Sequence, residues 1–157
     1  MANLALTVLS MTIGFFFLIV GIIKLSPILN DDIYKDQRKA FIKFVKVFPF
    51  YRQTGWKPDP HVYRRVIGIL EVICGLILAV IPGTLKQVAN AILLIIMIGA
   101  LYTSWALKFS LDKMTPTLIF GLLLLCRLIV FAQVRAREKR LQVEAEKQKE
   151  AWEKKTD

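Results

Sequence analysis

Hydrophobic residues gather in four long blocks, which are separated by shorter polar or basic segments. The blocks cover residues 4–23, 62–81, 88–107 and 117–132. A helix needs about 20 mostly apolar residues to cross a bilayer, and only a helix satisfies its own backbone in hydrocarbon. The pattern therefore predicts an all-α membrane protein with a bundle of four transmembrane helices. A buried core helix is the alternative for any single block, but four blocks in one short chain favour the membrane.

A different pattern fills the connection between the first two blocks. Over residues 31–48, apolar side chains recur at helical spacing, while basic side chains take much of the remaining surface. The apolar set is Ile33, Tyr34, Phe41, Phe44, Val45 and Phe48, and the basic set is Lys35, Arg38, Lys39, Lys43 and Lys46. This segment is predicted to be an amphipathic helix that either lies on the bilayer surface or caps the bundle. Pro49 is expected to end it.

The remaining connections, 82–87 and 108–116, are too short for a separate domain. After residue 132 the chain becomes rich in Glu, Lys, Arg and Gln, which predicts either a solvated helix or a disordered arm. The chain therefore divides into a transmembrane domain, residues 1–132, and a charged tail, residues 133–157.

Four spans place both termini on one side of the membrane, but basic residues flank both sides and leave the orientation open. Lys154-Lys155-Thr156-Asp157 resembles the dilysine address that returns membrane proteins to the endoplasmic reticulum, and that address is read from the cytosol. We therefore expect a multi-pass protein of the endoplasmic reticulum membrane with both termini and the tail in the cytosol. The amphipathic connection would then face the lumen.

Composition supports the membrane class. Of the 157 residues, 55% are hydrophobic, and a soluble domain of this size has too little interior to hide so much apolar mass. No Lys or Arg precedes Leu4, and the first block is longer than the apolar part of a signal peptide, so it is expected to be a retained helix. The net charge of +10 points to anionic lipid headgroups rather than to nucleic acid.

Few residues could support metal or thiol chemistry. Cys74 and Cys126 both lie inside predicted spans, so a secreted disulfide framework is not expected. The single histidine, His61, cannot build a zinc site. We therefore expect no metal, no cofactor and no enzymatic activity.

Ionisable residues inside the blocks are the candidate functional residues, because a charge in hydrocarbon costs at least a few kcal/mol. Gly68, Glu71 and Gly75 share one helix face, and glycines there let another helix approach closely. Lys24 is the favoured partner of Glu71, with Arg127 either joining the pair or reaching the opposite headgroups. The three charges are predicted to form an intramembrane polar cluster. Whether that cluster only holds the bundle together or binds a partner stays open.

Several short segments each carry little information about the protein family, but their order and spacing together are specific. They are Phe15-Phe16, Gly21-Ile22-Ile23-Lys24-Leu25-Ser26-Pro27, Val47-Phe48-Pro49, Pro58-Asp59-Pro60 with Tyr63, Gly68-Ile69-Leu70-Glu71-Val72-Ile73-Cys74-Gly75, Val88-Ala89-Asn90 and Gly121-Leu122-Leu123-Leu124-Leu125-Cys126-Arg127-Leu128. Together, over residues 12–130, they resemble the transmembrane protein 35 family, a DoxX-like group that includes the NACHO-type chaperones of nicotinic acetylcholine receptors.

The resemblance implies a four-helix protein of the endoplasmic reticulum that promotes folding and assembly of nicotinic acetylcholine receptors or related membrane clients. Lys24, Glu71, Cys126 and Arg127 stand where that family has the same residue types. The alternative is a DoxX-like protein that binds a small hydrophobic molecule or serves as a redox subunit. A passive structural subunit of a larger complex is a third possibility.

Overall fold

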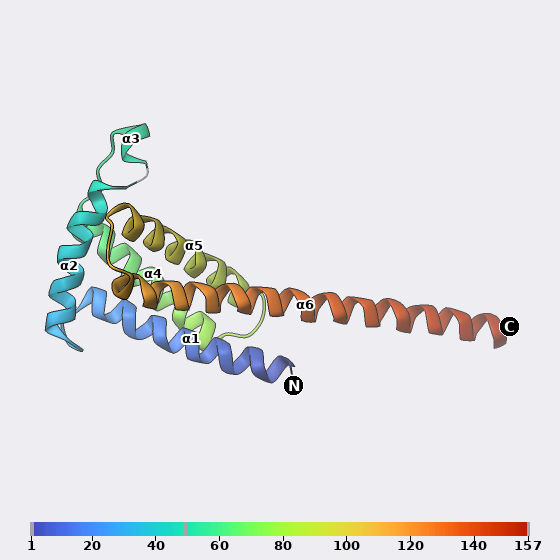
Figure 1. Ribbon diagram of the computed structural model, residues 1–157. Coiled ribbons are helices and arrows are strands. Elements are labelled where there is room, and N and C mark those ends of the chain that lie inside the picture. Colours follow the sequence, from blue (N-terminus) through green and yellow to red (C-terminus); the bar gives the residue numbers. More distant parts are fainter. Residues whose placement is uncertain (1, 49, 157) are drawn as a thin grey trace.

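The computed structural model describes residues 2–48 and 50–156, and the regular structure in these ranges is entirely helical. The helices are α1 (Ala2–Leu25), α2 (Asp31–Lys46), α3 (Tyr51–Thr54), α4 (Pro60–Val80), α5 (Leu85–Ala106) and α6 (Leu111–Thr156). In Figure 1, α1, α4, α5 and the first half of α6 form a bundle, and α2 crosses one end of it. The expected all-α class is confirmed.

Three of the described helices are long and apolar enough to cross a membrane. They are Leu4–Leu25 within α1, Leu85–Ala106 and Leu111–Thr156. Helix α4 is not among them because it carries Arg64, Arg65 and Glu71. Three candidate spans are therefore established, and the fourth stays a prediction.

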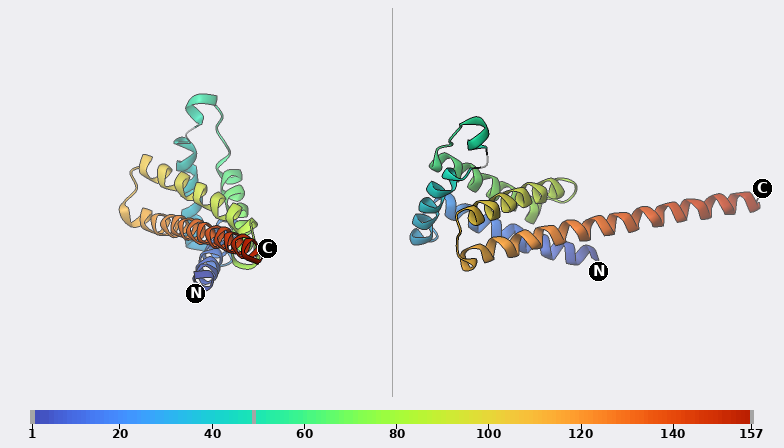
Figure 2. Two further views of the ribbon diagram at one scale, coloured as in Figure 1. Left: turned by 90° about the vertical axis from the view of Figure 1, so that its right-hand side faces the viewer. Right: turned by 45° about the horizontal axis from the view of Figure 1, so that its top comes forward.

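The two chain ends lie on the same side of the bundle, opposite α2 (Figures 1 and 2). Helix α6 continues far beyond the bundle, and its residues 135–156 are exposed throughout. Of the two alternatives for the tail, the structure shows a helix, continuous with the fourth apolar block. Its last residue, Asp157, lies outside the described residues.

Polar caps set the starts of two helices. The Asn30 side chain accepts a hydrogen bond from the Ile33 backbone N–H at 3.1 Å and so begins α2. Asp59 does the same for α4, accepting from His61 and Val62 at 2.8 and 3.3 Å. Helix α2 ends at Lys46, two residues before the predicted end, and Pro49 lies outside the described residues.

One predicted boundary was wrong. Residues 108–116 were expected to form a connection, but α6 begins at Leu111 and includes Pro116. The Ser110 carbonyl starts this helix by accepting from Lys113 and Met114 at 3.0 and 3.3 Å. Pro116 is the sixth residue of α6, beyond the first turn, and the helix continues there without the hydrogen bond that this backbone position would otherwise donate.

Helices α1 and α4 pack more extensively than any other described pair, because glycines on both let the backbones approach closely. A Cβ added to Gly14 would lie 2.6 Å from the Gly75 carbonyl oxygen, and one added to Gly21 would lie 2.8 Å from that of Gly68. These two contacts place α1 antiparallel to α4.

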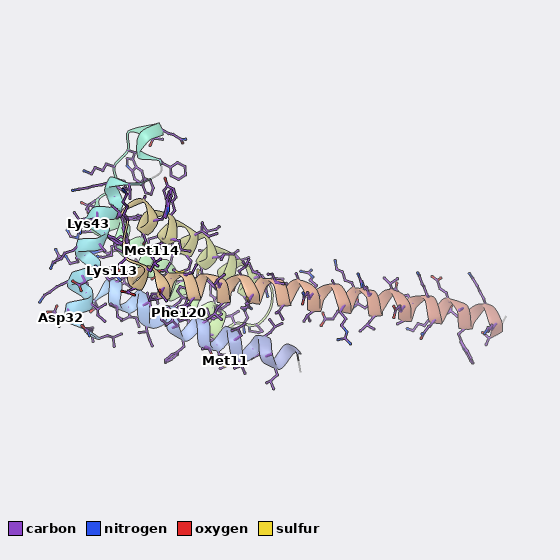
Figure 3. The ribbon with its side chains drawn as sticks, viewed as in Figure 1. Met11, Asp32, Lys43, Lys113, Met114 and Phe120 are labelled. Carbon is purple, nitrogen blue, oxygen red and sulfur yellow. The ribbon has the colours of Figure 1, made fainter. Side chains whose placement is uncertain are left out.

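The main hydrophobic core lies between α1, α4, α5 and α6. Ile13, Phe17, Leu78, Leu93 and Leu124 are each fully buried. On the edge of this core, the ring of Phe16 stacks on that of Phe120, with centroids 3.4 Å apart. Figure 3 shows Phe120 on α6 where that helix runs beside α1. Residues from the first and fourth apolar blocks thus meet in one core.

Candidate intramembrane site

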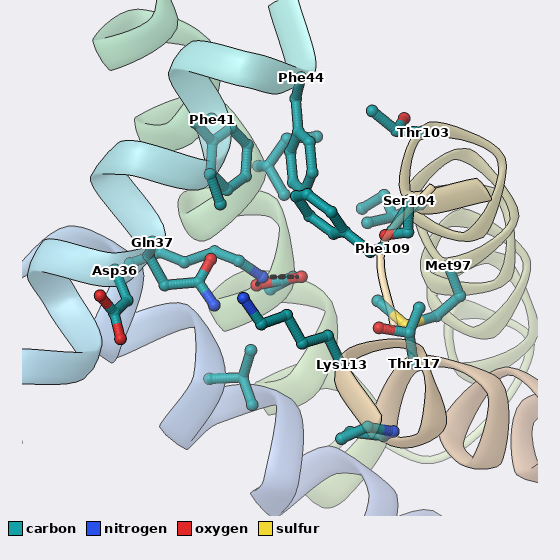
Figure 4. Close-up of a pocket in the computed structure, with 18 of the residues that line it drawn as sticks. Asp36, Gln37, Phe41, Phe44, Met97, Thr103, Ser104, Phe109, Lys113 and Thr117 are labelled. Atoms are coloured by element: carbon teal, nitrogen blue, oxygen red, sulfur yellow. Dashed lines mark hydrogen bonds and ion pairs between the residues drawn. The ribbon is translucent and has the colours of Figure 1, made fainter. Parts of the chain in front are cut away.

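A buried ion pair joins the end of α1 to the middle of α4. The Lys24 ammonium lies 2.6 Å from each carboxylate oxygen of Glu71 (dashed in Figure 4). Glu71 is fully buried, and Lys24 is 8% exposed. A single buried charge costs several kcal/mol, so each of these two side chains compensates the other in an apolar setting. The close α1–α4 packing makes this contact possible.

The glycine face of α4 is covered by α1 of the same chain. A Cβ on Gly68 would meet Leu25 Cγ at 3.1 Å, and one on Gly75 would meet the Gly14 carbonyl oxygen at 2.8 Å. Glu71, which lies between these glycines on the helix, therefore faces α1 and not an external surface. Binding of an outside partner by this face remains a prediction.

Arg127 lies in a different place from Lys24 and Glu71. Its Nε donates to the Ser10 hydroxyl oxygen at 2.7 Å, and one terminal nitrogen donates to the Gln87 side-chain oxygen at 3.1 Å. Ser10 and Lys24 are 14 residues apart on α1, which is about 21 Å along the helix axis. The three predicted residues therefore form two sites, one at each end of the bundle. Arg127 therefore does not join the Lys24–Glu71 pair, and a reach toward the opposite headgroups stays a prediction.

Arg64 is a buried polar residue that sequence reasoning missed. It is 2% exposed, and its guanidinium donates to the Lys24 backbone carbonyl and, at 3.2 Å, to the Tyr34 hydroxyl oxygen. The guanidinium also lies over the Tyr34 ring, 4.6 Å from its centroid. Arg64 thus ties α1, α2 and α4 together. The sequence contains a signal for this position, because Arg64 stands seven residues before Glu71 and therefore lies on the same face of the helix.

Helix α2 packs on the bundle through its aromatic side chains. Phe41 and Val45 are buried. The Phe41 ring lies 5.5 Å from that of Tyr63 on α4, and the Phe44 ring lies 6.0 Å from that of Phe109, which precedes α6. These edge-on and tilted contacts are favourable arrangements for aromatic pairs. They make α2 the cap of this end of the bundle.

A cavity of about 570 Å³ lies beneath this cap, and both Lys24 and Glu71 line it. Its apolar walls include Phe16, Phe17, Phe41, Phe44, Tyr63, Met97 and Phe109. Gln37 and Lys113 point into it from α2 and α6 (Figure 4). The volume is in the usual range of small-molecule sites, about 300–1,000 Å³. The arrangement can hold an apolar body next to a few polar groups.

Both cysteines are free thiols. Cys74 is buried and Cys126 is exposed. Among the described residues, no group of three His, Cys, Asp or Glu side chains is placed to hold a metal ion.

Residues 38–127, from α2 to the middle of α6, match the sequence model of the DoxX-like family. The chain belongs to the DoxX-like family. It is 37% identical over 131 residues to the novel acetylcholine receptor chaperone of Xenopus tropicalis, a match that covers 83% of this chain and 80% of the relative. It is 33% identical over 155 residues to the protein of the same name in Mus musculus, covering 97% and 92%.

These comparisons confirm the family that the ordered segments over residues 12–130 predicted. The DoxX-like match includes Glu71 and ends at Arg127, whereas Lys24 lies before it. The α4 half of the ion pair is therefore inside the DoxX-like core, and the α1 half comes from the preceding helix.

Proposed function

We propose that this DoxX-like chain is a membrane chaperone of the endoplasmic reticulum that promotes folding and assembly of nicotinic acetylcholine receptors. It acts through helix contacts within the membrane and catalyses no reaction. The observation that carries the proposal is the identity of 33–37% to relatives named novel acetylcholine receptor chaperone, over most of both chains. The transmembrane domain is the working part, since the tail beyond it is a single exposed helix.

The proposed membrane topology has four spans, with α4 as the fourth member of the set. Lys24 pairs with Glu71 inside the bundle, which lowers the energetic cost of placing the Glu71 charge in hydrocarbon. Arg64 and Arg65 follow the start of α4 by four and five residues, about 6–8 Å along the axis. At that depth the exposed Arg65 reaches the interface, while the buried Arg64 bonds the Lys24 carbonyl and the Tyr34 hydroxyl inside the chain. The domain then covers residues 1–132, followed by a cytosolic tail.

Within this proposal, Lys24, Glu71, Gly68 and Gly75 hold α1 against α4, and the client contact lies elsewhere. Ile95, Ile98, Tyr102 and Trp105 recur at helical spacing on α5 and are 48–71% exposed. These four residues form what we call the α5 face. It is the surface that we propose for a transmembrane helix of a receptor subunit.

Gly99 supports this choice of surface. It is exposed on α5 beside Ile98, and a Cβ added there would meet nothing within 4 Å. Packing inside the chain therefore does not explain this glycine, although glycine in a helix costs about 0.5–1 kcal/mol relative to alanine. Small residues on a membrane helix allow another helix to approach closely. A client helix would use the space that Gly99 leaves open.

The proposal is tested by expressing receptor subunits in cells that lack an endogenous chaperone. Wild-type chain should raise the amount of assembled receptor at the cell surface. Gly99→Ile should reduce this effect while leaving the chaperone's own level unchanged, because the added side chain meets open space. Ala5→Ile, at an exposed position on α1, is the control and should act as wild type. Unchanged surface receptor with wild-type chain would refute the proposed function.

The proposed location and orientation rest on the dilysine pattern. Lys154 and Lys155 are exposed near the end of α6, where a cytosolic receptor could read them. Replacing both with serine should move the protein to later compartments, as seen by microscopy and by glycan processing of an attached reporter. A tag on the tail should be accessible when only the plasma membrane is permeabilised. A tag accessible only after the inner membranes are opened would reverse the orientation.

A second function is favoured by one observation, the cavity of about 570 Å³ beneath α2. Its aromatic walls suit a small hydrophobic molecule held near the Lys24–Glu71 pair, as in a lipid-binding or redox subunit. Mass spectrometry of organic extracts from the purified protein tests this alternative. A stoichiometric quinone, sterol or haem would support it, and an extract holding only bulk phospholipid would count against it.

A further inference from the structure

A second cavity, of about 460 Å³, lies at the end of the bundle opposite α2. Three parts of the chain line it: the first half of α1, the α4–α5 connection with the start of α5, and the middle of α6. Both chain ends leave the bundle on this side (Figure 1). The cavity is therefore separate from the Lys24–Glu71 site, and nothing in the proposed chaperone mechanism uses it.

Arg127 lines this cavity, and neutral groups hold it. It is 2% exposed, yet its recorded acceptors are the Ser10 hydroxyl and the Gln87 side-chain amide. No ion pair among the described residues involves Arg127. A guanidinium has five N–H donors, and these two bonds use two of them. A buried arginine in this state keeps its charge and lacks a counter-charge.

The other charges in the cavity increase the need for an anion. Lys86 and Arg135 line it together with Arg127, and Glu138 is the one carboxylate of the lining, so the net charge of the four side chains is +2. Lys86 and Arg127 line the same cavity, so their positive charges repel each other across it. An anion bound between them would relieve that repulsion. Arginine is well suited to phosphate, because its planar fork donates two parallel hydrogen bonds.

Depth and lining identify the source of the phosphate. Arg127 follows Leu111 by 16 residues, about 24 Å along α6, and the hydrocarbon core is about 30 Å thick. Arg127 therefore lies close to the headgroup layer on the side of the chain ends. Leu6, Phe131 and Val134 supply apolar walls beside the basic groups. A ligand with a phosphate and an acyl chain matches both halves of this lining.

We propose that this cavity binds the phosphate headgroup of an anionic phospholipid, with Arg127, Lys86 and Arg135 as its ligands. Basic pockets between membrane helices are a general way of recognising such headgroups. The bound lipid would fix the α4–α5 connection against α1 and α6. This inference does not depend on the proposed function, since it concerns a different end of the bundle.

Native mass spectrometry of the detergent-purified full chain tests the proposal, with dioctanoyl phosphatidic acid as the probe. Dioctanoyl phosphatidylcholine has the same chains with a neutral headgroup, and inorganic phosphate has the anion without chains. We expect phosphatidic acid to bind more tightly than either. Equal binding of the two lipids would overturn the proposal. Displacement of phosphatidic acid by an equal concentration of inorganic phosphate would overturn the assignment to a lipid.

Arg135→Gln and Arg137→Gln form a matched pair of variants. Both arginines are exposed on α6, but only Arg135 lines the cavity, so both variants should fold as wild type. Losing Arg135 should weaken phosphatidic acid binding about fivefold, the effect of one basic side chain near a charged lipid surface. Arg137→Gln should leave it within a factor of two. Equal losses in both variants would show general charge attraction and overturn the site.

Discussion

The Lys24 ammonium lies 2.6 Å from both carboxylate oxygens of Glu71. Both side chains are buried between α1 and α4. Two pairs of glycines on the same helices bring the backbones close enough for this contact. The charge of Glu71 is thus compensated inside the chain. This explains how a helix with a central carboxylate can be part of a membrane bundle.

Glu71→Gln should destabilise the protein, because it leaves the Lys24 ammonium buried without its counter-charge. Removing one member of a buried pair costs about 3–5 kcal/mol. Replacing both, as in Lys24→Met with Glu71→Met, should recover most of that loss, since a buried pair exchanged for apolar side chains is often neutral. Thermal unfolding of the wild type, Glu71→Gln and the double variant in one detergent measures both differences. A Glu71→Gln protein with wild-type stability and full activity would show that this charge is dispensable.

Gly14→Ala should destabilise the α1–α4 contact, since its new Cβ would lie 2.6 Å from a backbone oxygen that cannot move independently. Overpacking of this kind costs about 1–3 kcal/mol. Gly99→Ala is the matched control, because a Cβ there meets nothing within 4 Å. It should stabilise the protein slightly, since alanine favours a helix more than glycine does. Equal unfolding temperatures of the two variants would contradict the close packing.

Arg64→Gln should loosen α2 from the bundle, because Arg64 bonds the end of α1 and the Tyr34 ring and hydroxyl of α2. Faster amide hydrogen exchange over α2, with α5 unchanged, is the expected result. Arg65→Gln changes the exposed neighbour and should leave α2 protected as in wild type. If both variants exchange alike over α2, the Arg64 contacts do not hold the cap.

Asp59 should make the start of α4 sensitive to acid. Backbone hydrogen bonds from His61 and Val62 lower the pKa of its carboxyl below the ordinary value. The stabilisation is therefore fully present above the ordinary pKa and is lost as the pH falls through the lowered one, below about pH 4. Asp59→Asn keeps a capping oxygen without the charge. The stability difference between wild type and Asp59→Asn should shrink between pH 7 and pH 3, and a constant difference would contradict this role.

Hydropathy predicted the helical class and the position of each apolar block, because a run of about 20 apolar residues has few other solutions. It predicts that the fourth span starts after Pro116, because a proline inside a helix lacks a backbone donor, whereas α6 begins at Leu111 and continues through Pro116. Contacts between segments were harder to predict. Glycine spacing on α4 predicted close packing of a helix, but the matching pair on α1, Gly14 and Gly21, lies in a block with no charged residue to single it out.

Contacts of the buried polar residues could also be predicted only in part. Lys24 was predicted over Arg127 as the partner of Glu71, and the structure shows that contact. The acceptors of Arg127, Ser10 and Gln87, are 117 and 40 residues away in the sequence and have no charge to mark them. Such neutral partners depend on helix rotation and tilt, which periodicity does not determine.

Promotion of nicotinic acetylcholine receptor assembly by this chain can be measured as surface receptor in cells that lack an endogenous chaperone. Receptor subunits are expressed alone, with the wild-type chain, and with Gly99→Ile, and surface ligand binding is measured for each. We expect a clear rise with wild type and a smaller rise with Gly99→Ile at equal chaperone levels. Surface receptor that does not change when the wild-type chain is added would contradict the proposed function.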